Sequence, residues 1–183
     1  KGANFAKENN IEVIIAVGGG STIDIAKLIK AFIHSDGNEE NIVVGSAPVT
    51  DPIIPLIGIP TTAGSGSEAT HFAVVYLGKD KYSLTAPCLL PTAVILDGAL
   101  VLSGNKYLRA CNALDAMSQA IESFWAAGSN KKSQDYSLLA IEHGWKLMKN
   151  FASDNCSNFD AQKMMEAAHL AGKAINISKT TAA

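Results

Sequence analysis

A short apolar segment that runs through three glycines into a helical pattern constrains the fold of this chain more than any other feature. Residues 12–17 (EVIIAV) are almost wholly apolar and β-branched, which is typical of a strand buried on both faces of a parallel sheet. Three glycines, Gly18–Gly20, end this strand, and a helix is expected over residues 22–33. Such a turn leaves bare backbone N–H groups at a helix N-terminus, where an anionic phosphate can approach.

The glycine turn matches neither of the two common phosphate-binding motifs. A Rossmann fingerprint needs a third glycine where Ile23 stands, and in a Walker A loop the lysine comes earlier than Lys27 does. Ser21 is expected to cap the helix, with Asp24 in the place of a capping box. The alternative to a phosphate site is a tight strand-to-helix turn that needs glycine only for its backbone conformation.

A second polar loop follows the next apolar strand, which is expected over residues 53–59. This loop, residues 60–70 (PTTAGSGSEAT), alternates hydroxyl side chains with two glycines. Further strands are expected over residues 72–77 and 94–96, so strands, loops and helices alternate as in an α/β fold. Ligands of open α/β sheets bind beyond the carboxyl ends of strands, and both loops lie at such ends. Alone, the second loop could equally be a flexible connector.

The second half of the chain changes to helical spacing throughout. Helices are expected over residues 113–127, 132–151 and 161–175, with their aromatic residues Phe124, Trp125 and Trp145 in helix cores. We therefore predict two domains, an α/β nucleotide-binding part over residues 1–100 and an all-helical part over residues 101–183.

The composition excludes several classes of protein. The chain has 183 residues with 15 basic and 17 acidic side chains, so neither disorder nor phosphate-driven nucleic-acid binding is expected. No stretch is long and apolar enough to span a membrane. Three widely spaced cysteines and no secretory signal favour reduced thiols in the cytoplasm. Only 17% of residues are charged, and no Met begins the chain, so we expect a fragment of a longer protein that forms a homodimer or larger homo-oligomer.

Four segments in succession resemble motifs of the iron-containing alcohol dehydrogenases. They are GGGSTIDIAK, PTTAGSGSEAT, LPTAVILDGAL and ALDAMSQAIES, in residues 18–27, 60–70, 90–100 and 113–123. The resemblance implies an incomplete parallel-sheet dinucleotide-binding domain followed by an incomplete all-helical domain, an architecture similar to that of dehydroquinate synthase. It also implies NAD(P) and a divalent metal, iron or zinc, meeting between the two domains, with a small aldehyde or alcohol as the substrate.

The resemblance also assigns residues to the cofactor site. The pyrophosphate would be held by Gly18, Gly19, Gly20 and Ser21, and the rest of the cofactor site would be lined by Thr61, Thr62 and Ser67.

The metal position departs from the family pattern. Asp115 would be the first ligand, but Gln119 stands one helical turn later where most members have histidine. An amide oxygen is a weaker ligand for iron or zinc than imidazole, which puts the identity and presence of the metal in question. The two further histidine ligands of the family have no match in this chain, which is expected to end before them.

A narrower resemblance concerns the substrate. The segments DAMSQAIESFW and AGKAINISKTT resemble the phosphonoacetaldehyde reductases of this family, which would form 2-hydroxyethylphosphonate with NAD(P)H. Lys173 and Lys179 are the candidates for binding the phosphonate, and solvated lysines near a helix end are the alternative. His71 is expected to be structural, and Asp97 is expected to cap a turn at the domain junction. Two other functions stay open: a non-catalytic nucleotide-binding protein and a relative of the glycerol dehydrogenases.

Overall fold

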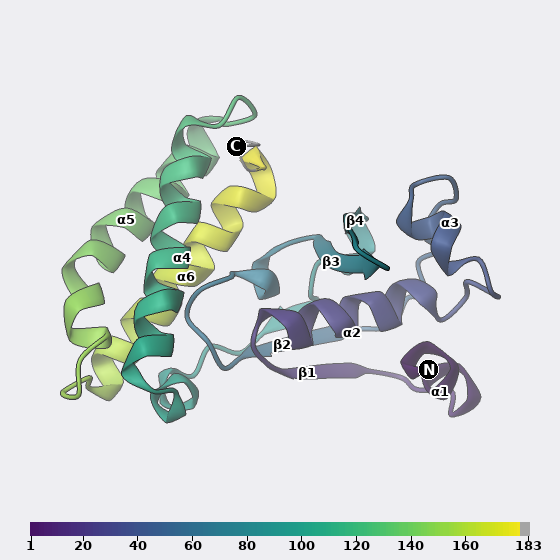
Figure 1. The fold of residues 1–183 in the computed structure, drawn as a ribbon, viewed down its shortest axis with the longest axis horizontal. Helices are drawn as coiled ribbons and strands as arrows, with labels where there is room; N and C mark the ends of the chain where they lie inside the picture. Colours follow the sequence, from purple (N-terminus) through teal and green to yellow (C-terminus); the bar gives the residue numbers. More distant parts are fainter. Residues whose placement is uncertain (180–183) are drawn as a thin grey trace.

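The computed structural model describes residues 1–179 as an α/β layer followed by three long helices (Figure 1). The elements in chain order are α1 (Gly2–Glu8), β1 (Ile14–Gly18), α2 (Gly20–Phe32), α3 (Glu39–Val43), β2 (Leu56–Pro60), η1 (Ser67–Ala69), β3 (Phe72–Leu77), β4 (Asp80–Thr85), η2 (Pro87–Leu89), β5 (Ala93–Val94), η3 (Gly98–Ser103), α4 (Lys106–Trp125), α5 (Lys131–Phe151) and α6 (Asn158–Ser178). This arrangement confirms the α/β fold class that the sequence predicts.

A parallel sheet in the order β1-β2-β5 forms the base of the α/β layer. In its register Ile14 pairs with Leu56 and Gly18 pairs with Pro60, so β1 and β2 end side by side. The backbone N–H of Thr61 donates to the carbonyl oxygen of Gly18 at 2.9 Å. The two glycine-rich loops therefore leave the sheet at the same edge, as expected for a ligand site in a parallel sheet.

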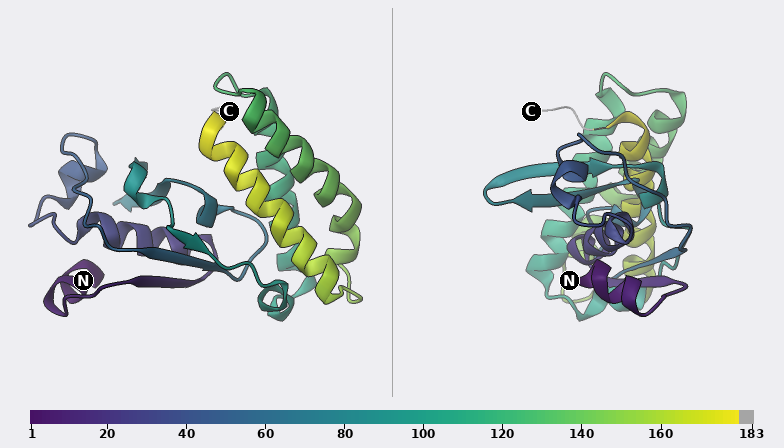
Figure 2. Two further views of the ribbon diagram at one scale, coloured as in Figure 1. Left: turned by 180° about the vertical axis from the view of Figure 1, so that it is seen from behind. Right: turned by 90° about the vertical axis from the view of Figure 1, so that its right-hand side faces the viewer.

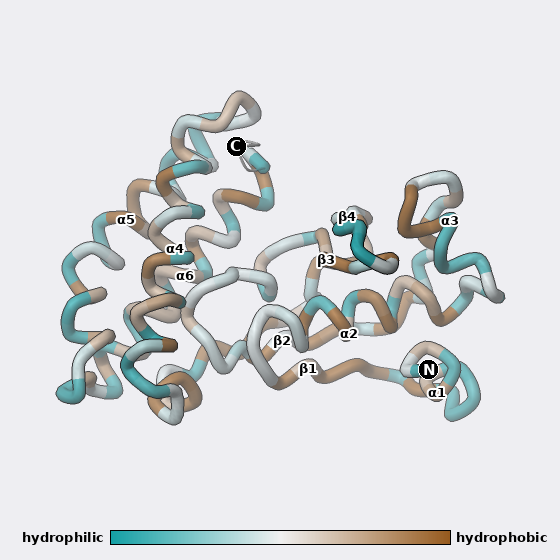
Figure 3. Tube along the Cα trace, viewed as in Figure 1, coloured by the Kyte–Doolittle hydropathy of each residue, from teal (hydrophilic) through white to brown (hydrophobic). Residues whose placement is uncertain are grey.

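The sheet is covered on one face by α2, whose Ile23 is fully buried. Figure 3 shows β1 as an apolar stretch, but only Ile14 and Ala16 point into this core. Ile15 and Val17 on the opposite face are 57% and 54% exposed. The expectation of burial on both faces is therefore wrong for residues 1–179, because no described element covers the second face.

The strand expected from residue 53 begins three residues later, at Leu56. Ile53 has a positive φ of 48° and is 90% exposed, so it lies outside the sheet. Pro52 and Pro55 stand on either side of residues 53 and 54. Neither proline has a backbone N–H that could donate a hydrogen bond to a neighbouring strand. Proline thus delays the strand despite the apolar composition of the segment.

The three long helices pack side by side at one end of the sheet (Figure 2). Their core consists of small and flexible side chains, among them Ala113, Ala116 and Met164, together with the ring of Phe151. Trp125 and Trp145 are 66% and 71% exposed, so the prediction that they lie in helix cores is wrong. Alanine at the contact faces lets the helix backbones approach closely, which leaves no room there for an indole ring.

Helix α4 begins earlier than the spacing of its apolar residues predicts. It starts at Lys106, and the side chain of Asn105 caps it by accepting from the N–H of Leu108 at 2.9 Å. Asp97 caps the turn before it by accepting from Ala99 N–H at 2.9 Å, which confirms its expected capping role. No helix within residues 1–179 combines the length and apolarity that crossing a bilayer requires.

Candidate active-site cleft

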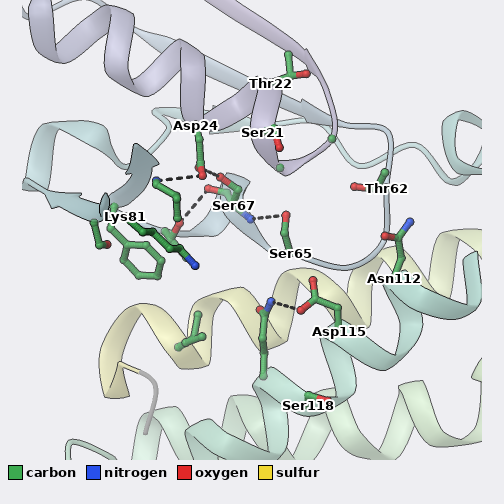
Figure 4. A pocket seen from close by; sticks show the side chains of 18 of the residues that line it. Ser21, Thr22, Asp24, Thr62, Ser65, Ser67, Lys81, Asn112, Asp115 and Ser118 are labelled. Carbon is green, nitrogen blue, oxygen red and sulfur yellow. Dashed lines mark hydrogen bonds between the residues drawn. The ribbon is translucent and has the colours of Figure 1, made fainter. Parts of the chain in front are cut away.

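A cavity of about 910 Å³ lies between the glycine turn, the loop of residues 60–70, the β3–β4 hairpin and α4 (Figure 4). Its lining includes Gly19 and Gly20 on one side and Asp115 and Gln119 on the other. The structure therefore brings the expected phosphate site and the expected metal position to one space. Its volume is in the range of small-molecule and cofactor sites.

The glycine turn opens the N-terminus of α2 to this cavity. Gly19 is the N-cap residue, and no side chain in the described part of the chain caps this helix. The first N–H groups of a helix have no partner within the helix, so those of Gly20 and Ser21 are available to an anion, whereas Thr22 already donates to the carbonyl oxygen of Gly19. Side chains larger than hydrogen do not fit at positions 18 and 20. A Cβ on Gly20 would collide with the side chain of Ser65, and a Cβ on Gly18 would lie 2.5 Å from Thr22 Oγ1.

The expected capping box at this helix is wrong. The helix begins at Gly20, so Ser21 is its second residue rather than its cap, and Ser21 is exposed and lines the cavity. The carboxylate of Asp24 is engaged elsewhere, because it accepts from the hydroxyl of Ser67 and from the N–H of Val74.

The second loop contributes hydroxyl side chains to the same cavity. Thr62, Ser65, Ser67 and Thr70 line it, whereas Thr61 is outside the lining and contributes its N–H to the sheet. Of the seven expected cofactor residues, five therefore face the cavity, namely Gly19, Gly20, Ser21, Thr62 and Ser67.

The two glycines of this loop contact the helices rather than the cavity. Gly66 has φ of 61°, and a Cβ there would lie 2.6 Å from Cα of Gly172 in α6. A Cβ on Gly64 would lie 3.0 Å from the carbonyl oxygen of Asn112 in α4. The sequence shows that the loop contains two glycines, but it does not show that they allow close contact with α4 and α6. Those contacts join segments that are far apart in the chain.

Asp115 and Gln119 lie one turn apart on α4, and both line the cavity. The amide nitrogen of Gln119 donates to Oδ1 of Asp115 at 3.0 Å, while Oε1 of Gln119 is buried without a partner among the described residues. In this arrangement Asp115 can offer a carboxylate oxygen to a cation, whereas Gln119 turns its amide nitrogen, and not its oxygen, toward that carboxylate. Within residues 1–179 no group of three or more His, Cys, Asp or Glu side chains could hold an ion.

The two lysines expected to bind the phosphonate lie apart. Lys173 lines a separate cavity of about 330 Å³, with its Nζ 5.8 Å from the ring centre of Tyr136. Lys179 Nζ lies 2.7 Å from Nε2 of His71 and 5.3 Å from the ring centre of Phe72, which lines the main cavity. Burial lowers the pKa of Lys179, and burial together with this ammonium group lowers the pKa of His71.

Lys81 and Asn112 are among the residues at this site that sequence reasoning missed. Lys81 on β4 lines the cavity beside Tyr76 of β3, and Asn112 on α4 lines it one turn before Asp115. The hairpin that carries Lys81 has no motif of its own, so no signal in the sequence links it to the glycine turn.

The sequence model of iron-containing alcohol dehydrogenases matches residues 1–98, just over half of the chain. The chain belongs to the iron-containing alcohol dehydrogenase family. This membership confirms the resemblance carried by the four motifs.

Individual members of the iron-containing alcohol dehydrogenase family are similar over almost the whole chain. A 4-hydroxybutyrate dehydrogenase of Cupriavidus necator is 34% identical over 94% of this chain and 46% of its own length. A phosphonoacetaldehyde reductase of Streptomyces viridochromogenes is 29% identical over 93% of this chain and 45% of its own length. The chain thus spans about half the length of the curated relatives it matches.

A solved structure agrees with the fold. The sulfoacetaldehyde reductase from Bifidobacterium kashiwanohense, in complex with NAD+, superposes with a TM-score of 0.92 at 29% identity. The match covers 98% of this chain and 48% of that protein. The architecture of an iron-containing alcohol dehydrogenase is therefore present from the first glycine turn through α6.

Proposed function

We propose that the protein carrying this chain is an NAD(P)-linked alcohol dehydrogenase or aldehyde reductase. One observation carries the proposal: the open N-terminus of α2 and the carboxylate of Asp115 face the same cavity. Family membership supports it, as does the similarity to a reductase solved with NAD+.

The diphosphate of the dinucleotide would bind at the first turn of α2. Backbone N–H groups near Gly19, Gly20 and Ser21 would donate to its oxygens, and the helix dipole would favour its charge. The hydroxyl of Thr62 would donate to the neighbouring part of the cofactor, and Ser67, whose hydroxyl donates to Asp24, would line the wall beside it. Gly18 and Thr61 would not contact the cofactor. The hydrogen bond between them would hold the two loops in position beside each other.

Asp115 and Gln119 would hold a divalent metal at the other end of the cavity. When bound, the nicotinamide cofactor supplies a hydride to a carbonyl carbon, and a metal supplies Lewis-acid polarisation of its oxygen. Asp115 would contribute the negative charge that fixes the cation, and Gln119 would orient that carboxylate through its amide nitrogen.

Among small aldehydes, we propose one with an anionic group, such as phosphonoacetaldehyde. Lys179 supports this choice, because its ammonium group lies above the ring of Phe72 at the cavity wall. Lys173 lines the other cavity, so of the two expected lysines the geometry favours Lys179 for this role.

Steady-state kinetics with NADH and NADPH, with and without a chelator, test the proposal. Phosphonoacetaldehyde and an uncharged aldehyde of similar size are the substrates to compare. In Lys179→Ala we expect KM for phosphonoacetaldehyde to rise about tenfold or more while KM for the uncharged aldehyde stays unchanged. Lys173→Ala is the control, with both values near those of the wild type.

Two results would contradict parts of this assignment. If Lys179→Ala changes KM equally for both substrates, the proposed preference for an anionic aldehyde is contradicted. The proposed reductase activity is not affected by that result. Binding of a dinucleotide without reduction of any aldehyde or oxidation of any alcohol would favour the non-catalytic alternative.

A further inference from the structure

A second cavity, of about 330 Å³, lies between the segment that leads into β5 and the helices α5 and α6. Its lining shares no residue with that of the main cavity, which includes the glycine turn and Asp115. Its volume is at the lower end of the range of small-molecule sites. The cofactor, the metal and the aldehyde of the proposed function therefore leave this space free.

The lining of the second cavity is partly apolar. Leu90, Pro91 and Val94 line it from the side of β5, and Ile177 lines it from α6. The ring of Tyr136 on α5 adds aromatic surface. Apolar side chains around a space of this size favour the hydrocarbon part of a small organic molecule over a hydrated ion.

Two lysines give the second cavity a positive charge. Lys132 in the first turn of α5 and Lys173 on α6 both line it, and neither forms an ion pair within residues 1–179. The carboxylate in the lining belongs to Glu68, which is buried, and its Oε1 lies 3.1 Å from Nδ1 of His169. The two ammonium groups are therefore free to donate to an anionic group, and hydrogen bonds between charged groups are among the stronger ones.

The turn η1 separates the second cavity from the main cavity. Ser67 and Thr70 line the main cavity, whereas Glu68 between them lines the second one. Asn176, which also lines the second cavity, accepts from the N–H of His71 at 2.8 Å through its Oδ1. Residues of the second cavity thus bind the segment 67–72, whose other side is the wall of the main cavity.

We propose that the second cavity binds a small organic anion and that the bound anion stabilises segment 67–72. The anionic group would lie at the ammonium groups of Lys132 and Lys173. A short hydrocarbon body would lie against Leu90, Pro91 and Ile177. This site goes beyond the proposed function, because it shares no lining residue with the proposed cofactor and metal positions.

NMR titration of the protein that carries this chain with benzoate tests the site, without any dinucleotide present. Benzoate combines a carboxylate with a small apolar body, and benzamide has nearly the same shape without the charge. We expect a Kd for benzoate of about 1 mM or lower and a Kd for benzamide at least about tenfold higher.

Three variants locate the bound benzoate. Lys132→Met and Lys173→Met keep most of the side-chain length and remove the charge, and each should raise the Kd for benzoate about tenfold. Lys163→Met is the matched control, since Lys163 is also on α6 but pairs with Glu166 and lies outside this lining. It should bind benzoate with the wild-type Kd.

Three results would overturn the site. They are equal affinity for benzoate and benzamide, wild-type affinity in both Lys132→Met and Lys173→Met, and a loss of affinity in Lys179→Ala alone. The first two would show that the lysines are merely solvated. The third would place the ligand in the main cavity.

Hydrogen exchange of residues 67–72 tests the effect on the shared wall. We expect slower exchange when benzoate is added to the wild type, because a ligand that binds only the closed form of the segment reduces its opening. The same concentration should have no effect in Lys173→Met. Unchanged exchange in the wild type at saturating benzoate would overturn the second part of the proposal.

A consequence for the cofactor rests on the proposed function. Fluorescence titration with NADH should give a Kd about fivefold lower at saturating benzoate, because the wall of the main cavity is then already ordered. An unchanged or higher Kd for NADH would overturn this consequence. A protein that binds neither NADH nor NADPH would contradict the proposed function, while the benzoate titrations would still decide whether the second site exists.

Discussion

Gln119 is the residue that distinguishes this site from the family pattern. Its amide nitrogen donates a hydrogen bond to one carboxylate oxygen of Asp115. Its own amide oxygen is buried without a partner among the described residues. A neutral imidazole would present a nitrogen with a lone pair at this position, which suits iron and zinc, whereas an amide oxygen is a weak ligand for either. We therefore expect the metal affinity of the proposed site to depend largely on this one side chain.

Replacing Gln119 with histidine should strengthen metal binding. We expect Gln119→His to lower the Kd for Zn²⁺ at least about tenfold, because an i, i+4 pair of carboxylate and imidazole can bind one ion. Competition against a chromophoric chelator measures this. Leu114→His is the control, since Leu114 adjoins Asp115 but is 56% exposed and lies outside the cavity lining. An equal gain in both variants would contradict the placement of the site.

The buried charge of Lys27 should give stability a measurable dependence on pH. The folded-state pKa is about 8, below the ordinary value of 10.5, so between these values the unfolded chain binds more protons than the folded one. The contribution of Lys27 to the free energy of unfolding therefore rises as the pH increases from about 8 to 10.5. We expect the free energy of unfolding of the wild type, relative to Lys27→Met, to increase by about 3 kcal/mol from pH 8 to pH 10.5. Urea denaturation across this range measures it, and a constant difference would contradict the assignment.

At the scale of elements, the loop of residues 60–70 and α6 depend on a close backbone contact. Gly66 and Gly172 face each other, and a Cβ on Gly172 would lie 2.6 Å from the carbonyl oxygen of Gly66. Backbone atoms on both sides cannot move away independently, because the loop also carries the hydrogen bonds to Lys27. The glycines thus determine how near the loop lies to the helices.

Alanine at Gly172 should be destabilising despite its higher helix propensity. We expect Gly172→Ala to lower the free energy of unfolding by about 2–3 kcal/mol, because the added methyl group meets backbone. Gly144→Ala is the matched control in α5. Its Cβ would meet Sδ of Met117 at 2.5 Å, and a methionine side chain can move. A change within about 1 kcal/mol is expected there. Equal losses in chemical denaturation would contradict this account.

At the scale of the whole molecule, polar contacts join the α/β layer to α6. Glu68 is buried, and its Oε1 lies 3.1 Å from Nδ1 of His169, while the N–H of His71 donates to Oδ1 of Asn176 at 2.8 Å. These contacts join residues more than 100 positions apart in the chain. They connect the wall of the cavity to the helices that complete it.

Loss of this connection should reduce the cooperativity of unfolding. Glu68→Ala leaves His169 without its partner, and we expect it to cost about 1–3 kcal/mol and to broaden or divide the calorimetric transition. Glu142→Ala on α5 removes an exposed pair with Lys146 and should leave the transition unchanged. A single sharp transition at the wild-type temperature in Glu68→Ala would show that this pair does not couple the two parts.

The existence of most elements was predictable, whereas their ends and burial were not. The apolar run before Gly18 predicts a strand, and β3 has the bounds that its sequence predicts. The start of β2 was missed because Pro52 and Pro55 outweigh apolar composition. The division into domains at residue 100 stays a prediction, and so do the individual roles of the candidate site residues.

By itself the sequence determined the α/β character, the glycine turn and the family, because these depend on local patterns and on motifs in fixed order. Only the tertiary structure decided that Gly19 and Asp115 share a cavity, that Asp24 and Lys27 hold residues 70–74 at its wall, and that Trp125 is exposed. The physical reason is distance along the chain. Spacing predicts which residues share a face of one element, but a contact between elements depends on how all of them pack.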